Sequence, residues 1–406
     1  MARLLEDDAL GLLREAGIDV PPYETVSTPE ATADAVMRLG GHAVLKALIP
    51  VGARGKAGAV QLVEGKEEAL ATSRALLGKT ILHYPITELL VSALVDIERE
   101  LFVSFAFDSE TKRPQLLFSA EGGVDIETIL KENPASLIRH PISLLHGLTD
   151  LDAQRVTERG GLNGDAATNV ATSLCTLWRV FSDCEAAVLE INPLVLTPDN
   201  NVVAPTGVVG LDDDALPRHL KLAEAADRIR TNGWRPLSAL ELEMRRIDAT
   251  DDSSGIRFNE FPEGDIALMV SGGGTGMSAL DALYRAGGRA ACTMDITPGR
   301  IEEKTYLATK AILSSPNVKG LLAGSPFINF IPVDVKVRGT MRALEEMGVD
   351  PQHFPIVFRF DGPNIENAKE LAAALPGIVF FDAATPMEVA AQEIVRLTYD
   401  KGAELG

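Results

Sequence analysis

The part of the chain from residue 266 onward alternates short apolar runs with longer stretches of helical spacing. Strands that alternate with helices indicate βαβ units, and therefore a parallel, doubly wound α/β sheet. Strands are expected over residues 266–270, 291–296, 318–323, 356–358 and 378–381. Helices are expected after a glycine turn at 271–277 and over residues 301–313, 333–347, 365–374 and 386–399.

Unusual polar segments follow three of these strands, at residues 271–276, 325–329 and 359–364. Ligands of a doubly wound sheet bind beyond the carboxyl ends of its strands. A glycine-rich turn that begins a helix is a general anion site, so Ser271 and Gly273 are candidates for holding a phosphoryl group or a carboxylate. The acid that would read a ribose about 20 residues further on is not in place, which disfavours NAD. For any single glycine, a turn that only needs a positive φ remains the alternative.

Residues before about 210 follow a different order, with short strands and helices mixed as in an α+β domain. Helices are expected over residues 3–16, from Thr28-Pro29 onward and over residues 166–182. Strands are expected over residues 42–47, 59–63, 89–95 and 101–107. A turn into a further helix is expected at residues 119–127.

A glycine-rich hairpin at residues 52–58 carries Arg54 and Lys56. Glycines let backbone N–H groups approach an anion closely, and the two cations add charge. The hairpin lacks the GxxxxGK[ST] pattern of a Walker loop. A flexible basic turn that binds nothing is the alternative interpretation.

Residues 190–195 place a carboxylate, an amide and a proline between two apolar runs. Because Pro193 cannot continue a central ladder, we expect a strand end here, with Glu190 and Asn192 facing a cleft. Residues two apart lie on the same face of a strand, and their oxygens suit Mg²⁺. A strand end with ordinary polar residues is the alternative.

A chain of 406 residues is too long for one core, and we expect a boundary near residue 240, giving domains 1–240 and 241–406. The net charge of −20 disfavours nucleic-acid binding, because polyanions are repelled. No apolar run reaches about 18 residues, so no membrane span is expected. Three cysteines without CxxC pairs, and an acidic N-terminus without a signal-peptide pattern, favour a cytoplasmic protein without a zinc site.

Six stretches, in order along the whole chain, carry a resemblance to the β subunits of the ADP-forming acyl-CoA ligases. This family comprises succinyl-CoA synthetase, malate–CoA ligase and the amino-terminal part of ATP-citrate lyase with citryl-CoA synthetase. The stretches are residues 44–46, 53–58, 96–100, 121–124, 189–195 and 269–276. The resemblance implies an ATP-grasp domain followed by a flavodoxin-like CoA-ligase domain.

The resemblance also implies a mechanism with ATP and Mg²⁺. ATP phosphorylates a histidine, the phosphoryl group passes to a bound carboxylate, and the CoA thiolate attacks the resulting acyl phosphate. In this family the histidine and the CoA site belong to an α subunit. None of the six histidines here lies in a glycine-rich loop of that kind, so the resemblance implies a partner α subunit.

Site residues follow from the matching positions. On the nucleotide side, the resemblance assigns the phosphates to Lys46, Arg54 and Gly55, and an acid to Glu100. It assigns a Mg²⁺ ligand to Asn192 and the orientation of the histidine to Glu190. The turn that holds Ser271 and Gly273 matches the start of the helix that cradles the phosphohistidine.

Three positions depart from the family. Thr206 and Val208 stand where the family has the aspartate that completes the Mg²⁺ site and a lysine. Ser92 replaces an acid, and Ser271 replaces an asparagine of the succinate enzymes. A neutral Thr206 is a poorer Mg²⁺ ligand than a carboxylate. Two accounts therefore stay open, a ligase with a rearranged metal site and a degenerate non-catalytic subunit. The acids 212–214 could supply a ligand or be an acidic linker.

Substrate choice rests on residues 324–330, which resemble the citrate-binding loop of ATP-citrate lyase. Ser325 and Asn329 could hydrogen-bond a carboxylate or a hydroxyl of a small carboxylate substrate. The paired arginines expected further on are here Arg359 and Phe360, and Asp361 would repel an acid. Citrate itself is therefore in doubt, and a ligase with an acceptor other than CoA is a third interpretation.

Overall fold

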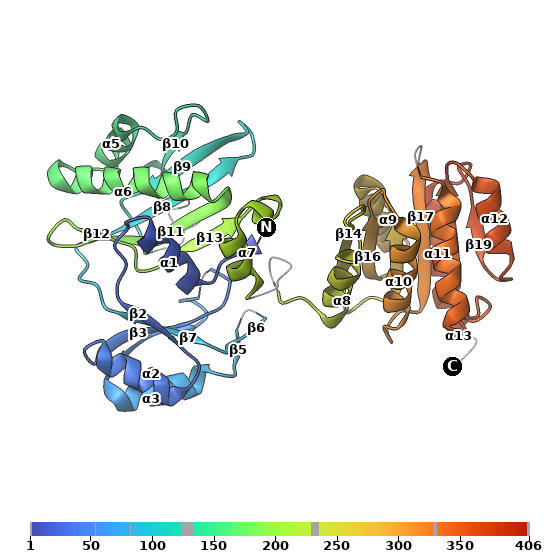
Figure 1. Ribbon diagram of the computed structural model, residues 1–406, viewed down its shortest axis with the longest axis horizontal. Helices are drawn as coiled ribbons and strands as arrows, with labels where there is room; N and C mark the ends of the chain where they lie inside the picture. The colour runs from blue at the N-terminus through green and yellow to red at the C-terminus, as the bar shows by residue number, and fades with distance from the viewer. Residues whose placement is uncertain are drawn as a thin grey trace. The chain divides into compact units, whose positions relative to one another are not determined.

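The computed structural model describes residues 2–52, 54–81, 83–123, 131, 133–228, 235–327 and 331–403. The chain divides into two compact units, Met1–Pro236 and Leu237–Gly406 (Figure 1). The helix expected after residues 119–123 lies largely outside the described residues. No helix in the described ranges combines the length and the apolar character that crossing a membrane requires.

A small antiparallel sheet, in the order β2-β7-β3-β4, forms one part of the first unit. Its strands are β2 (Tyr23–Val26), β3 (His42–Ala47), β4 (Val60–Glu64) and β7 (Leu89–Ala93). Helices α2 (Pro29–Arg38) and α3 (Gly65–Leu76) pack against it, and β5 (Thr80–Ile81) pairs with β6 (Tyr84–Pro85) nearby (Figure 1). The expected start of α2 is confirmed, because the Thr28 hydroxyl accepts a hydrogen bond from the Ala31 N–H at 3.2 Å.

A larger sheet in the order β1-β13-β11-β8-β9-β10 forms the rest of the first unit. Its strands are β1 (Ala2–Arg3), β8 (Arg99–Asp108), β9 (Arg113–Ser119), β10 (Ile138–Pro141), β11 (Ala186–Leu196) and β13 (Val208–Leu211), and β12 (Val202–Val203) pairs with β11. Among the described residues, four helices share its core: α1 (Glu6–Glu15), α5 (Asp150–Arg159), α6 (Gly164–Asp183) and α7 (Leu220–Asp227). The expected helix over residues 3–16 therefore begins later, because Ala2 and Arg3 pair with β13.

The strand end expected at Pro193 is wrong. β11 continues through the proline to Leu196, and its pairing with β8 shifts register between Ile191 and Leu194. Pro193 has no N–H to donate, and the register shift removes the need for one. The irregularity leaves Glu190 and Asn192 within a long strand.

The second unit contains a sheet in the order β14-β16-β15-β17-β18-β19. Its strands are β14 (Ile256–Glu260), β15 (Ile266–Val270), β16 (Ala290–Ile296), β17 (Gly320–Phe327), β18 (Ile356–Asp361) and β19 (Val379–Phe381). All pairs except β14–β16 are parallel, which confirms the expected doubly wound sheet. Strands β15 to β19 have the flavodoxin order 2-1-3-4-5.

Helices cover both faces of this sheet. Alternate residues of β15 point to opposite faces, and each set packs against its own group of helices. Ala267 and Met269 share a core with α10 (Ile301–Leu313), α11 (Val333–Glu346) and α12 (Ile365–Ala373). Ile266 and Leu268 share the other core with α9 (Gly273–Arg285) and α13 (Met387–Ala403).

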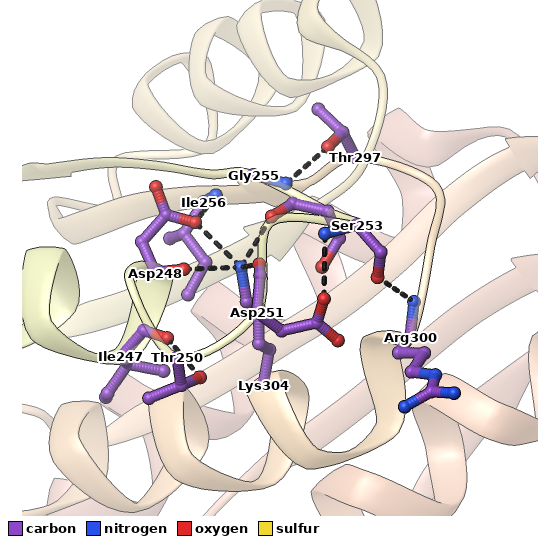
Figure 2. A network of polar contacts seen from close by, with 11 residues as sticks. Ile247, Asp248, Thr250, Asp251, Ser253, Gly255, Ile256, Thr297, Arg300 and Lys304 are labelled. Atoms are coloured by element: carbon purple, nitrogen blue, oxygen red, sulfur yellow. Dashed lines mark hydrogen bonds and ion pairs between the residues drawn. The ribbon is translucent and has the colours of Figure 1, made fainter.

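The described part of the segment between β13 and β15 forms helices and one strand. It contains a 3₁₀ helix η2 (Asp213–Arg218), α7 (Leu220–Asp227), α8 (Ala239–Asp248) and the edge strand β14. A capping box between Ser238 and Glu241 starts α8. Lys304 of α10, which is 1% exposed, fastens the loop after α8 (Figure 2). Its ammonium donates to the carbonyls of Asp248, Asp251 and Ser254 and to the Asp248 carboxylate.

Candidate functional site

A cavity of about 740 Å³ lies in the first unit, between strands of the small and the large sheet. It unites every nucleotide-side and metal candidate from the sequence. These residues are Lys46, Arg54, Gly55, Glu100, Glu190, Asn192 and Thr206. Val208 and Lys56 also line it.

Two of its cations are joined to a buried carboxylate that the sequence analysis did not single out. Lys46 Nζ donates to Glu6 Oε1 at 2.8 Å, and the Arg54 guanidinium donates to Glu6 Oε2. Glu6 is 3% exposed, and burial alone would raise the pKa of its carboxyl. The charges of Arg54 and Lys46 outweigh that effect and hold the pKa of Glu6 below its ordinary value.

Backbone carbonyls fix the same two cations further. Lys46 Nζ donates to the Pro205 carbonyl at 2.6 Å, and Arg54 donates to the Ala47 carbonyl at 3.0 Å. Two cations share one carboxylate here, so this part of the cavity keeps a net positive charge. A phosphate chain would find both cations already oriented, which lowers the entropy lost on binding.

Glu190 projects into the cavity from β11, opposite Val208 of β13 and Ser104 of β8. Burial raises the pKa of the Glu190 carboxyl, and the charge of Arg3 opposes this rise only in part. No hydrogen bond or ion pair joins the side chain of Glu190 to another residue of the described ranges. Its carboxylate is therefore accessible to a group that enters the cavity.

Asn192 and Glu100 are linked through the glycine turn at Gly122 and Gly123. The Gly123 N–H donates to Asn192 Oδ1 at 2.9 Å. A Cβ on Gly123, whose φ is +72°, would lie 2.0 Å from a Glu100 carboxylate oxygen. Only glycine allows this approach, which holds Glu100 and Asn192 at the same end of the cavity.

The side-chain oxygens of Asn192, Glu190 and Thr206 are the protein atoms that could hold Mg²⁺. In the described part of the chain no group of three or more His, Cys, Asp or Glu side chains could bind a metal alone. Mg²⁺ usually takes one or two protein oxygens, several waters and the phosphates of its nucleotide. The donor set fits an ion that enters with a nucleotide. The acids 212–214 do not line the cavity, so the structure does not supply the extra ligand from them.

In the second unit, Ser271 and Gly273 occupy the turn between β15 and α9. The Ser271 N–H donates to the Gly324 carbonyl of the neighbouring strand at 2.9 Å. Gly272 has a φ of +88° and α9 begins at Gly273, so the expected glycine turn into a helix is present. Lys336 of α11, which the sequence analysis missed, donates a hydrogen bond to the Ser271 hydroxyl.

Ser325 lies next to this turn, on β17. Its side chain is fully buried, and its hydroxyl has no hydrogen-bond partner among the residues that the structure describes. Arg359 of β18 donates to the Ser325 carbonyl at 2.9 Å and to the Thr385 carbonyl at 3.0 Å. Asn329, the other candidate of this loop, lies outside the described residues.

Phe360 stands where a second arginine was expected, and it is buried against the sheet. It lines a small cavity of about 20 Å³ together with Ser271 and Lys336. Burial lowers the pKa of the Lys336 ammonium to about 8, and Asp295 opposes this only in part. A basic group is thus present at this end of the sheet, although it comes from α11.

Comparisons with known proteins agree with this architecture. The model of the ATP-grasp domain family matches residues 3–196. Succinate–CoA ligase [ADP-forming] subunit beta of Rubrobacter xylanophilus is 34% identical over 370 residues, covering 91% of this chain and 92% of that protein. The protein of the same name from Chloroflexus aurantiacus is 37% identical over 372 residues, covering 91% and 93%.

A third relative and a solved structure are also similar to this chain. Succinate–CoA ligase [GDP-forming] subunit beta of Thermus thermophilus is 34% identical over 373 residues, covering 92% of this chain and 94% of that protein. Among solved structures, ATP citrate lyase from Methanothrix soehngenii in complex with citrate and coenzyme A aligns with a TM-score of 0.78 and 25% identity. That alignment covers 98% of this chain and 99% of the other.

Proposed function

Because this chain belongs to the family of succinate–CoA ligase β subunits, we propose that it is the nucleotide-binding subunit of an ADP-forming carboxylate–CoA ligase. The observation that carries this proposal is the cavity of the first unit. It gathers two oriented cations, an accessible carboxylate and an amide oxygen around one space. Phosphoryl transfer needs this kind of positioning and charge more than covalent help from the protein.

The candidate residues of the cavity each have a proposed role. Lys46 and Arg54 hold phosphate oxygens of ATP, while Gly55 lets the backbone of the turn approach them. Glu100 is the acid that contacts the bound nucleotide. Mg²⁺ neutralises phosphate charge when it is bound, and Asn192 and Thr206 would hold it.

Glu190 orients the histidine that accepts the phosphoryl group. Its raised pKa and its lack of a partner in the described chain suit a carboxylate that hydrogen-bonds an incoming imidazole. That histidine and the CoA site belong to a partner α subunit. The acceptor is a small carboxylate, which binds at Ser271, Gly273 and Ser325 in the second unit, with Asn329 as a further candidate.

A non-catalytic partner subunit is the second candidate function. Thr206 favours it, because a hydroxyl replaces a carboxylate at the place where Mg²⁺ would bind. A ligase that transfers the acyl group to an acceptor other than CoA is a variant of the first proposal. Relatives named as ADP-forming and as GDP-forming both match, so GTP is the alternative to the proposed ATP.

Trapping of the acyl phosphate tests the proposal. The chain, co-expressed with an α subunit of the same genome, is incubated with Mg-ATP, hydroxylamine and a panel of carboxylic acids. We expect acid-dependent ADP and hydroxamate with the wild type and with Lys66→Ala, an exposed lysine of the same unit. Neither product should form with Lys46→Ala. If no acid gives hydroxamate, the non-catalytic function is favoured, and hydroxamate without CoA-dependent thioester favours another acceptor.

A further inference from the structure

Two buried lysines of the second unit have very different surroundings. Lys304 is 1% exposed and is surrounded by four oxygens, one of them a carboxylate (Figure 2). Lys336 is 6% exposed, and its hydrogen bond in the described chain goes to the neutral hydroxyl of Ser271. A buried ammonium without an anionic partner is costly, because burial removes its water without replacing the charge interaction. Lys304 has an anionic partner, whereas Lys336 has none in the part of the chain that the structure describes.

The acids of the described part of the chain do not pair with Lys336. Asp295 of β16 affects its pKa, yet no ion pair between the two is formed. Asp295 Oδ1 is itself buried without a hydrogen-bond partner. Lys336 therefore keeps most of its capacity to bind an anion.

The hydroxyl of Ser325, on the strand next to Ser271, also lacks a partner in the described chain. Val270 is the register partner of Gly324, so Ser271 and Ser325 follow at adjacent strand ends. The Ser325 hydroxyl is buried without a partner, although Arg359 binds the carbonyl of the same residue. Buried hydroxyls are normally hydrogen-bonded. Ser325 neighbours Ser271, which binds Lys336, so one ligand at this strand end could complete both side chains.

The space available decides where such a ligand would lie. The cavity beneath Lys336 and Ser271, about 20 Å³, has room for roughly one water. A larger ligand must therefore approach from beyond the strand ends, where ligands of a doubly wound sheet bind. The hydrogen bond to Ser271 directs the Lys336 ammonium toward this end of β15.

We propose that Lys336 is a specificity-determining residue that binds a carboxylate group of the acid substrate at the carboxyl end of the parallel sheet. The Ser271 hydroxyl orients the ammonium, and the Ser325 hydroxyl donates to the same group. This inference rests on the proposed function, since it assigns a contact to that function's acid substrate. A carboxylate suits the site better than a phosphate, because its single negative charge is repelled less by Asp295.

Calorimetry on the full chain, without nucleotide, tests the assignment. Succinate, citrate, acetate and inorganic phosphate are titrated into the wild type, Lys336→Met and Lys310→Met. Lys310 is a matched control, because it belongs to the same unit but pairs with Glu346 on the surface. At least one carboxylate should bind the wild type and Lys310→Met equally, and at least tenfold more weakly to Lys336→Met.

Further variants keep the test decisive. Lys336→Arg should retain part of the affinity, and Lys336→Gln replaces the Met variant if that protein fails to fold. Unchanged carboxylate affinity without the ammonium would overturn the proposal. So would a wild type that binds none of the carboxylates, or Lys336-dependent binding of phosphate alone.

The test of Lys336 can be distinguished from a test of the proposed function. Mg-ATP is titrated into the same samples in a second experiment, which reports on the first unit. Loss of carboxylate binding in Lys336→Met with normal Mg-ATP binding supports both proposals. Carboxylate binding that needs Lys336 in a chain that binds no Mg-ATP contradicts only the proposed function.

Discussion

Glu6 Oε1 lies 2.8 Å from Lys46 Nζ, and the other oxygen of the same carboxylate accepts a hydrogen bond from Arg54. One acid of α1 thereby positions both cations of the nucleotide cavity. The three side chains come from α1, β3 and the glycine-rich turn, so this contact joins α1, which packs in the core of the large sheet, to the small sheet.

Replacement of Glu6 by Gln should destabilise the chain by about 3 kcal/mol, because it leaves two buried cations without their counter-ion. Phosphate should restore more stability to this variant than to the wild type, since it supplies the missing negative charge. Urea unfolding with and without phosphate measures both effects. Glu24→Gln, which removes an exposed pair with Arg38, is the control and should change stability little. Equal unfolding of Glu6→Gln and wild type would show that the contact is not structural.

Stability should also depend on the Lys336 ammonium above neutral pH. Its pKa is lowered from 10.5 to about 8 in the folded chain, so between these values the unfolded chain holds more protons. Stability therefore rises with pH across this window, by at most about 3 kcal/mol from this group. Denaturant unfolding from pH 7.5 to 10.5 should show a rise that Lys336→Met lacks. The same slope in both proteins would contradict the lowered pKa.

An added carboxylate at position 206 should strengthen Mg²⁺-dependent ATP binding. Thr206 and Asn192 line the same cavity, so Asp at 206 adds an anionic ligand beside the amide oxygen. We expect about a tenfold lower Kd for Mg-ATP in Thr206→Asp, or about 1.4 kcal/mol. Thr206→Asn, which adds a neutral oxygen, is the matched control. If the gain in ATP affinity persists when Mg²⁺ is chelated, Asp at position 206 does not act as a Mg²⁺ ligand.

Glu190→Gln should impair the orientation of the partner's histidine without weakening the binding of Mg-ATP. The phosphate-binding cations remain intact in this variant, so the Kd for Mg-ATP should stay within about twofold. With the partner subunit, kcat should fall at least tenfold, because misplaced reacting groups lose rate without losing affinity. Stopped-flow ADP release and calorimetry provide the two numbers. An unchanged kcat would remove Glu190 from the phosphoryl-transfer step.

The second unit was largely predictable, because its apolar runs are long enough to specify strands without help from distant residues. β14 was missed for the opposite reason. It is an edge strand of mixed burial that follows the acidic residues 248–252, and its partner β16 begins about 30 residues later. The strand end at Pro193 was predicted from a local rule that a register shift against β8 overrides.

The cavity residues of the first unit were found through motifs, but their partners were not. Glu6 lies 40 positions from Lys46, and Ser271 lies 65 positions from Lys336. Local spacing carries no information about contacts of that length. One signal was present in each case, a charged residue within an apolar helical stripe: Glu6 beside Ala9, Leu10 and Leu13, and Lys336 beside Val333, Val337 and Thr340.

Direct titration of Mg-ATP into the purified chain tests the central claim, that this subunit binds and uses a nucleotide in the cavity of the first unit. We expect saturable heat for the wild type and for Lys66→Ala, reduced binding when Mg²⁺ is omitted, and at least tenfold weaker binding for Lys46→Ala. Wild-type heat no greater than that of Lys46→Ala would rule out nucleotide binding through this cavity and leave a non-catalytic subunit.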